Sequence, residues 1–502
     1  MGSKRGLAVI RRARARGQYK QSPLNLRLLA RVNTIRLATE MLRGQGKNQI
    51  YGAMLASPQW SCAQSYMSKT RRAAMFLMAL ALLMCFATAP RLSFDILMGV
   101  VTALIIFAAI IRWLACLSPK PKTRPIPDEF NWPKYTVLVP LHKEAKVVAG
   151  LMAALSKLDY PKDKLQILMI CEADDFQTIR AVEHNMTPLF DLVSVLPSLP
   201  RTKPKAMNVA MKRATGDIIT IYDAEDRPHP QQLKQAALAL HDNNKLGTVQ
   251  APLDYYNDHQ NWLTRQFTIE YAALFHVMNP FYARAGLPFP LGGTSNHMRR
   301  AALDECGLWD PHNVTEDADL SFRFSAFGWK IGMISGGTRE EAVSEFRNWK
   351  AQRERWLKGF MQSYAVHMRR PLAGSWRRGF TLQITLGLTI AAAFLHVPAV
   401  AILLGVGIFK LAAGTFGDIN IGFWLIFLFG YSGAYASNFV GIHRAGQRRL
   451  WGDVLFAPLY WILMFPAALG ALHQYITAPF HWNKTRHGDA DDYMAKVTTT
   501  RL

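Results

Sequence analysis

The chain has 502 residues, of which half are apolar and only 19% are charged. This balance excludes an intrinsically disordered chain, and the long charged stretches between apolar runs exclude a protein built wholly of membrane helices. The formal charge is +24, and the five cysteines are scattered without a C-x-x-C pair, which argues against a disulfide framework or a zinc ribbon.

The N-terminal part of the chain is strongly basic, since residues 1–72 hold 15 Lys or Arg residues and one acid. Such a block suits nucleic acid or anionic lipid. Here two uncharged runs follow it, Ala73–Ala89 and Ile96–Ile111, and each is near the length of a membrane span. We therefore expect a transmembrane hairpin at 73–117 and no nucleic-acid partner. The positive-inside rule predicts that residues 1–72 and the Arg112–Arg124 side are cytoplasmic.

Residues 118–378 read as a soluble domain, because no uncharged run there is long enough to cross a bilayer. Strand-like and helix-like segments alternate, which favours a doubly wound α/β sheet that binds ligands at the carboxyl ends of its strands. The predicted strands are Tyr135–Leu141, Leu165–Cys171, Leu192–Leu196 and Asp217–Tyr222, and predicted helices include Val147–Leu158, Lys205–Arg213 and Gln231–His241.

Residues 379–482 return to a membrane-like composition. The apolar runs are Gly379–Phe409, Ile419–Gly441 and Val454–Trp482. The first run contains Pro398 near its middle, so it is either one tilted helix or a tight hairpin. The sequence thus predicts three or four helices in this region, five or six spans in all, and a tail at 483–502.

The fourth predicted strand runs into three carboxylates, Asp223, Glu225 and Asp226. A cluster of hard oxygen ligands at the mouth of a parallel sheet suits Mg²⁺ or Mn²⁺, which bind phosphate oxygens as well. An acidic loop that caps the helix beginning near Pro230 would explain the same residues without a metal.

Two other predicted strands also end in acids, with Glu144 after the first and Glu172, Asp174 and Asp175 after the second. Carboxylates that converge at one sheet edge repel one another unless a cation or hydrogen-bond donors lie among them. This convergence favours a binding site. Lys205, at the start of the next helix, is expected to contact phosphate with help from the helix N-terminus, although a solvated basic turn has the same pattern.

Two further motifs lie nearer the second membrane region. T-E-D, at residues 315–317, precedes a helical stretch at Leu320–Phe327, where acids in a first turn are common caps. Gln352, Arg355 and Trp356 share one face of a later helix, because they are spaced at i, i+3 and i+4. An amide, a guanidinium and an indole on one face suit a diphosphate and a stacked sugar ring, or the anchor of an interfacial helix.

D-A-E-D, T-E-D and Q-R-E-R-W, in this order and between membrane segments, resemble the motifs of the processive family-2 glycosyltransferases. That group includes cellulose, curdlan and mixed-linkage β-glucan synthases. The resemblance covers roughly Lys134–Trp356 and the flanking spans, and the ordered pair T-E-D and Q-x-x-R-W is its most specific part. It implies a GT-A fold, a Rossmann-like α/β cytoplasmic catalytic domain inserted between α-helical transmembrane segments of a bacterial inner-membrane protein.

The resemblance also implies a donor site for a UDP-sugar. Glu144 and Glu172 stand where acids contact the uridine, and the assignment of Glu172 over its neighbours in C-E-A-D-D is open. Asp223 and Glu225 occupy the D-x-D positions that hold Mg²⁺ or Mn²⁺ and the diphosphate. Because the second acid of that motif is Glu225 here, Asp226 is an open alternative as the metal ligand.

Asp317 matches the catalytic base of the family, and Gln352, Arg355 and Trp356 match the motif that binds the diphosphate and the acceptor end. The implied reaction is inverting. The base removes the proton of the acceptor hydroxyl while that oxygen attacks the anomeric carbon, and the metal and Arg355 stabilise the departing UDP.

The function implied by the resemblance is polymerisation of a β-linked polysaccharide, a β-glucan from UDP-glucose, and its translocation across the inner membrane. The growing polysaccharide, the lipid bilayer and a periplasmic or outer-membrane export partner are the expected partners. Two alternatives stay open: a non-processive enzyme that loads a sugar onto a polyprenyl phosphate, and a catalytically silent, nucleotide-binding membrane scaffold. The sequence assigns neither the sugar, the linkage, the oligomeric state nor regulation by cyclic-di-GMP.

Overall fold

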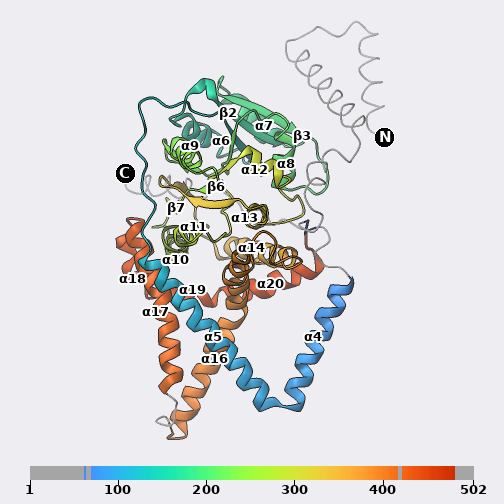
Figure 1. The fold of residues 1–502 in the computed structure, drawn as a ribbon, viewed down its shortest axis with the longest axis vertical. Coiled ribbons are helices and arrows are strands. Elements are labelled where there is room, and N and C mark those ends of the chain that lie inside the picture. The colour runs from blue at the N-terminus through green and yellow to red at the C-terminus, as the bar shows by residue number, and fades with distance from the viewer. Residues whose placement is uncertain (1–61, 64–68, 416–420, 481–502) are drawn as a thin grey trace. The chain divides into compact units, whose positions relative to one another are not determined.

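The computed structural model describes residues 62–63, 69–415 and 421–480 of the chain. Most of the basic region expected at 1–72 and the whole tail expected at 483–502 lie outside these described residues. The described part contains a mixed α/β unit and, on one side of it, long apolar helices (Figure 1).

A seven-stranded sheet with the order β3-β2-β1-β4-β8-β6-β9 forms the centre of the α/β unit. Its strands are β1 (Tyr135–Leu141), β2 (Leu165–Glu172), β3 (Phe190–Val195), β4 (Ile218–Ile221), β6 (Leu246–Gln250), β8 (Asn296–Arg299) and β9 (Lys330–Met333). All neighbouring strands are parallel except at β8, which is antiparallel to both β4 and β6. A smaller sheet of order β5-β10-β7 lies beside it, formed by β5 (Arg227–Pro228), β7 (Leu253–Tyr255) and β10 (Thr338–Glu340).

The four strands that the sequence predicts are confirmed to within two residues at each end. β1, with the sequence YTVLVPL, is buried at every residue except the half-buried Pro140, as expected for a parallel strand covered by helices on both faces. The antiparallel β8 was not predicted, because its sequence, NHMR, has neither an apolar run nor a clear alternation.

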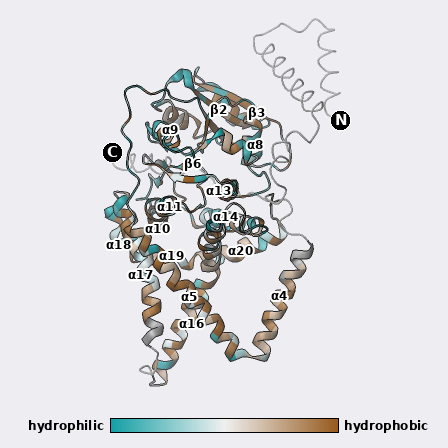
Figure 2. Cartoon of the chain, viewed as in Figure 1, coloured by the Kyte–Doolittle hydropathy of each residue, from teal (hydrophilic) through white to brown (hydrophobic). Residues whose placement is uncertain are grey.

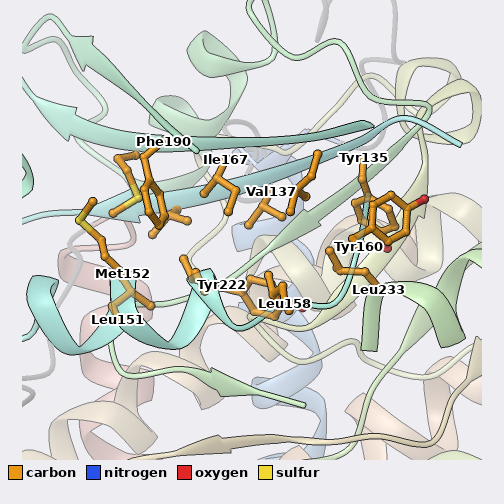
Figure 3. Close-up of a cluster of buried hydrophobic side chains, with 14 of the residues drawn as sticks. Tyr135, Val137, Leu151, Met152, Leu158, Tyr160, Ile167, Phe190, Tyr222 and Leu233 are labelled. Atoms are coloured by element: carbon orange, nitrogen blue, oxygen red, sulfur yellow. The ribbon is translucent and has the colours of Figure 1, made fainter. Parts of the chain in front are cut away.

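Helices cover both faces of the large sheet. They are α6 (Val148–Ser156), α7 (Phe176–His184), α8 (Lys203–Ala210), α9 (Gln232–Asp242), α12 (Arg300–Glu305) and α13 (Glu316–Ala326). Successive residues of β1 point to opposite faces. Val137 therefore packs in one apolar cluster with Leu151 of α6 (Figure 3), whereas Leu138 packs in another with Met207 of α8 and Leu320 of α13.

Several helices connect the sheet to the apolar region. They are α10 (Trp262–Ala273), the π-helical turn η4 (Leu274–Met278), α11 (Asn279–Arg284), α14 (Phe346–His367) and α15 (Trp376–Leu382). The apolar helices themselves are α4 (Lys69–Thr88), α5 (Pro90–Leu117), α16 (Leu388–Ala412) and α17 (Ile421–Arg444). Figure 2 shows that these four are hydrophobic along most of their length, as helices that face lipid must be.

Within the described residues, four helical segments are long and apolar enough to cross a membrane: Pro90–Leu117, Trp376–Ala412, Leu425–Arg444 and Ala457–Thr477. A shorter apolar helix, Phe76–Thr88, precedes them. The alternative of a hairpin within Gly379–Phe409 is wrong. α16 continues through Pro398 without a turn, and the π-helical segment Gln383–Gly387 joins α16 to α15.

The last apolar segment is bonded at both ends to the connecting helices α10 and α14. It comprises α18 (Trp451–Val454), α19 (Ala457–Ile462) and α20 (Met464–Thr477). At its start, Arg265 Nε of α10 donates to Asp453 Oδ1 at 2.7 Å. Just beyond its end, Gln362 Nε2 of α14 donates to the Pro479 carbonyl at 2.9 Å. Although this segment is apolar, its two ends therefore lie on the same side of the apolar region, next to α10 and α14.

Helix α17 touches two other helices through glycines. A Cβ built on Gly433 would lie 2.9 Å from the Cα of Ala109 in α5, and one on Gly441 would lie 2.6 Å from the backbone nitrogen of Ala273 in α10. Since real Cβ atoms do not come so close, only glycine permits this backbone-to-backbone packing. The apolar helices are thereby seated directly on the α/β unit.

Candidate active site

One cavity of about 870 Å³ lies at the carboxyl ends of β1, β2 and β4 and continues among the apolar helices. Eight of the residues singled out from the sequence line it: Glu144, Glu172, Asp223, Glu225, Asp317, Gln352, Arg355 and Trp356. The others, Asp174, Asp175, Lys205 and Asp226, do not. The structure thus brings together side chains that are spread over more than two hundred residues of sequence. The catalytic and binding roles that we expect for them stay predictions.

The loop after β4 presents its acids in two directions. Asp223 and Glu225 line the cavity. Asp226 points inward and is only 1% exposed, and its Oδ2 accepts hydrogen bonds from the Asp223 backbone N–H at 2.6 Å and from the Thr294 hydroxyl. Of the two open candidates for a metal ligand, Glu225 is therefore the one whose side chain faces the cavity.

A fourth carboxyl group at this place, Glu340 of β10, was missed by the sequence analysis. Burial and the nearby Asp226, Glu225 and Asp223 raise the pKa of Glu340 well above its ordinary value. Burial followed by Asp223 raises the pKa of Glu225 in the same way. A divalent cation stabilises the charged form of such carboxyl groups, and carboxylate oxygens are the type of ligand that Mg²⁺ and Mn²⁺ prefer. The sequence around the three-residue strand β10 does not indicate that this strand lies beside the loop after β4, so Glu340 could not be predicted as a neighbour of Asp223.

Lys203, and not the expected Lys205, contacts the acids of the loop after β4. Lys205 is only 2% exposed, and its Nζ donates to Glu172 Oε1 at 2.7 Å and to the Leu196 carbonyl at 3.4 Å, so it holds Glu172 in place instead of facing the cavity. Lys203, at the first position of α8, does line the cavity. Its Nζ donates to Asp223 Oδ1 at 2.5 Å and to the Gly293 carbonyl at 2.7 Å.

The T-E-D acids lie in the first turn of α13, across the cavity from the loop after β4. Asp317 Oδ1 accepts from the Ala318 backbone N–H at 2.7 Å. Burial raises the pKa of Asp317, while that N–H, Lys203 and Arg355 act in the opposite direction. Asp317 thus lies at the cavity wall, where Lys203 and Arg355 favour its charged form.

Glu316, beside Asp317, gives the donor-free protein a distinct pH dependence. Burial and then the Asp317 charge raise the pKa of Glu316 from its usual 4.5 to about 8. Between these two pH values the folded protein binds a proton that the unfolded chain releases, so this group's contribution to stability falls as the pH rises from 4.5 to 8. We expect the unfolding temperature of Glu316→Gln to fall less steeply over this range than that of the wild type, measured by thermal melts in detergent. The same dependence of unfolding temperature on pH in the variant and the wild type would contradict the raised pKa of Glu316.

α13 is tied to the helices that lead toward the membrane by a buried network. Asp319 accepts from Arg323 Nε at 2.8 Å and contacts His367 Nε2 of α14 at 2.9 Å. The other ring nitrogen of His367 lies 2.5 Å from Arg378 Nη2 of α15. All four side chains are at most 1% exposed, so the network fixes the position of α13, and with it Asp317, relative to α14 and α15.

Gln352, Arg355 and Trp356 of α14 line the same cavity, as their helical spacing predicts. Arg353, which the sequence analysis did not assign, lines it too. Its guanidinium binds both oxygens of Glu270 at 2.8 and 2.5 Å and lies 4.6 Å from the centre of the Trp356 ring. This packing holds the indole in place at the side of the cavity.

The part of the cavity beyond Trp356 is lined by α5, α16, α17 and α19. Its aromatic side chains include Phe427, Tyr431 and Trp461, and the Tyr431 and Trp461 rings lie 5.7 Å apart. Leu104 and Ala392 contribute aliphatic wall. The cavity therefore changes from charged at the strand ends to apolar and aromatic among the membrane-like helices.

Gly293 leaves an open space between the acids. A Cβ at this position would lie 3.4 Å from Asp317 Oδ2 and 3.8 Å from both Asp223 Oδ2 and Lys203 Nζ, which are ordinary contact distances. Gly293→Ala should therefore fold, but its methyl group occupies space between the acids. We expect turnover to slow by about 10- to 100-fold, the cost of a small misplacement of reactants. The control is Gly150→Ala, because a Cβ on Gly150 would have no other atom within 4 Å. Equal rates in the two variants would contradict the expected effect of Gly293→Ala.

The chain resembles known proteins both in sequence and in structure. Residues 218–472, just over half of the chain, match the family described as "Glycosyl transferase family group 2". The "Probable glycosyltransferase YdaM" of Bacillus subtilis is 28% identical over 237 residues, which are 45% of this chain and 55% of that protein. The "Beta-monoglucosyldiacylglycerol synthase" of Trichormus variabilis is 27% identical over 236 residues, covering 46% of this chain and 50% of that protein.

The "Glucomannan 4-beta-mannosyltransferase 2" of Arabidopsis thaliana is 26% identical over 252 residues, or 47% of each chain. The chain thus spans about half the length of the curated relatives that it matches. Among solved structures, the mannosyltransferase PcManGT of Pyrobaculum calidifontis, in complex with GDP-Man and Mn²⁺, has a TM-score of 0.51 at 18% identity, covering 75% of this chain and 97% of that one. The expected GT-A fold, beside helices apolar enough to span a membrane, is confirmed. On the match to residues 218–472, the chain belongs to glycosyl transferase family group 2.

Proposed function

We propose that the protein is an inverting glycosyltransferase that builds a β-linked polysaccharide, a β-glucan, from a UDP-sugar such as UDP-glucose and passes the growing chain into the membrane. The observation that carries this proposal is the single cavity, which runs from the acids at the strand ends past Trp356 and in among α5, α16 and α17. Donor chemistry at one end and an acceptor path at the other is the arrangement that polymerisation into a membrane requires.

The donor end of the cavity suits a nucleotide diphosphate. Asp223 and Glu225 would hold Mg²⁺ or Mn²⁺, which neutralises charge on the leaving diphosphate when bound. Lys203 and Arg355 supply further positive charge beside it, and donors fixed in advance stabilise charge that develops during the reaction. A solved relative by fold, PcManGT, was determined with a nucleotide sugar and Mn²⁺, which supports this assignment.

Asp317 is the base in this proposal. It removes the proton of the acceptor hydroxyl as that oxygen forms its bond to the anomeric carbon, and the bond from that carbon to the diphosphate breaks. Since no enzyme carboxylate attacks the sugar, the configuration at that carbon inverts, and an α-linked donor yields a β-linked product. Trp356 and the aromatic residues beyond it provide flat apolar faces on which sugar rings stack.

The geometry also supports a membrane topology with the α/β unit in the bacterial cytoplasm. Asp453 and Pro479, which flank Ala457–Thr477, bond to the connecting helices α10 and α14. We therefore place that segment at the membrane interface and let α4, α5, α16 and α17 cross. Four crossings return the chain to the side from which it starts. The basic region 1–72 and the basic stretch His443–Arg449 then share the cytoplasmic side, as the positive-inside rule prefers.

A second candidate is transfer of one sugar to a membrane lipid. The aliphatic wall around Leu104 and Ala392 favours it, because an acyl or prenyl chain would fit there. The name of one relative, a monoglucosyldiacylglycerol synthase, points to an acceptor of this class. Both candidates use the same donor end of the cavity and differ only in the acceptor and in the number of transfers.

One experiment separates them. The full-length chain in lipid nanodiscs is given each common UDP-sugar, and GDP-mannose, with Mg²⁺ or Mn²⁺, and nucleotide release and the labelled product are measured. Polymer that a β-glucanase digests supports the β-glucan proposal, while resistant polymer assigns another polysaccharide. Label that enters the organic phase as a single-sugar lipid supports the second candidate. Absence of nucleotide release with every donor would favour the silent scaffold over both.

Trp356→Ala tests whether the acceptor moves along the aromatic path. Loss of one stacking face costs about 0.5–1.5 kcal/mol, or roughly 2- to 10-fold in affinity. We expect shorter products at an unchanged half-saturating donor concentration, measured by product sizing and initial rates. Trp376→Ala, which removes an exposed indole outside the cavity, is the matched control. A loss confined to donor affinity would contradict the acceptor role.

A further inference from the structure

A second group of possible metal ligands lies outside the cavity. Cys62 belongs to the chain segment ahead of α4, and Asp310 and His312 belong to the loop that precedes α13. One ligand atom from each of these three side chains lies within 4.8 Å of the other two. None of the three lines the cavity, so the group is separate from the acids at the strand ends.

The Cys62 thiol donates a long hydrogen bond to Asp310 Oδ1, and the distances within this group also suit a shared metal ion. Cys62 Sγ lies 3.8 Å and His312 Nδ1 lies 3.6 Å from Asp310 Oδ1. A nitrogen–oxygen separation of 3.6 Å is too long for a good hydrogen bond. With zinc bonds of about 2.3 Å to sulfur and about 2.0 Å to nitrogen and oxygen, tetrahedral geometry separates neighbouring ligand atoms by about 3.3–3.5 Å. The two separations from Asp310 Oδ1 exceed those values by only a few tenths of an ångström, and the ligand atoms of Cys62 and His312 lie within 4.8 Å of each other.

We propose that Cys62 Sγ, Asp310 Oδ1 and His312 Nδ1 bind a Zn²⁺ ion, with water in the fourth position. Binding requires the thiolate, so the Cys62 thiol loses its proton to solvent when the ion enters. A thiolate and an imidazole prefer zinc, whereas the all-oxygen ligands in the cavity prefer Mg²⁺ or Mn²⁺. The two sites therefore select different metals, and this one does not depend on the function proposed above.

The surroundings hold the three ligands in advance. Asp310 and His312 are buried. The Asp310 carboxylate is oriented by the backbone N–H of Ala63, which donates to Oδ2 at 2.5 Å, and by that of His312, which donates to Oδ1 at 2.9 Å. Partners that orient ligands in this way raise the affinity of a metal site.

Two neighbouring segments close the site. Arg369 Nη1, just after α14, donates to the Cys62 carbonyl at 3.0 Å. The Phe480 ring, beyond α20, packs edge-on against the His312 ring at 5.5 Å. A zinc ion here would cross-link the segment ahead of the first apolar helix to the loop that leads into α13 and Asp317.

The test is metal analysis of the full-length protein, purified without a histidine tag and dialysed against buffer with Mg²⁺ but no chelator. We expect about one zinc ion per chain, because the three ligand atoms lie close enough together to share a single ion. Cys62→Ser and His312→Gln should each lose it. Cys85→Ser, in α4, and Asp223→Asn, in the cavity, should keep it, which separates this site from a free thiol and from the proposed donor site.

Zinc absent from the wild type, or retained in both ligand variants, would overturn the proposal. A second measurement covers the case in which a ligand variant does not fold. A zinc-selective chelator added to the wild-type protein should lower its unfolding temperature, and added Zn²⁺, but not Mg²⁺, should restore it. No response to the chelator would count against the site in the same way.

Discussion

Asp317→Asn is expected to lower the turnover number by about 10²–10⁴-fold, the usual contribution of a general base, while donor affinity stays nearly unchanged. The amide has the shape of the carboxylate and still accepts the Ala318 N–H, so the first turn of α13 should keep its geometry. What is lost is the ability to take a proton from the acceptor hydroxyl. Nucleotide release measures the turnover number, and calorimetric titration with UDP measures donor-site affinity.

The control for this prediction is Asp304→Asn, which neutralises an exposed carboxylate on α12 outside the cavity. It should leave both quantities at wild-type values. Full turnover in Asp317→Asn would remove Asp317 as the base. An equal loss of UDP affinity and turnover would move Asp317 to the donor site instead.

The second large effect is expected at the loop after β4. Since loss of even an outer partner of a metal ligand costs about 10- to 100-fold in metal affinity, Glu225→Gln should raise the metal concentration for half-maximal activity by at least about tenfold. Asp226→Asn should leave that concentration nearly unchanged. Burial raises the pKa of Asp226 well above its ordinary value, and the neutral amide can still accept from the Asp223 N–H and Thr294.

The measurement is a titration of nucleotide release with Mg²⁺ and with Mn²⁺ in both variants. Because the two substitutions are adjacent and each removes one carboxylate, each serves as the control for the other. If only Asp226→Asn raised the metal concentration for half-maximal activity, Asp226 would be the ligand. The loop would then have to change conformation when the donor binds, so that Asp226 faces the cavity.

Local patterns in the sequence were sufficient to predict four of the seven strands of the large sheet. β1, β2 and β4 are short apolar runs next to turn residues, and such strands can be identified without knowing their neighbours. β8 and β10 are different, because their positions depend on pairing with strands far away in the sequence. Their residues carry no periodic signal, so only the folded chain shows where they lie.

The same distinction applies to the site. Asp317 and Arg355 are found because they stand in motifs whose spacing is itself informative. Lys205 was assigned from the sequence, and Lys203 was not considered. Both lie at the start of α8, and Lys203 reaches Asp223 because Glu172 accepts from the Lys205 ammonium. The sequence could not supply the position of Glu172.

The glycines of α17 have a consequence for how a polymer would advance. Gly433 and Gly441 place the backbone of α17 in direct contact with α5 and α10, and the buried pairing of Asp319 with His367 ties α13 to the neighbouring helices. With so few compressible side chains between them, Asp317 is held at a fixed position relative to the apolar helices. In the proposed polymerisation, the product would therefore have to slide by the length of one sugar after each addition, and the sugar-to-sugar repeat would be the step size.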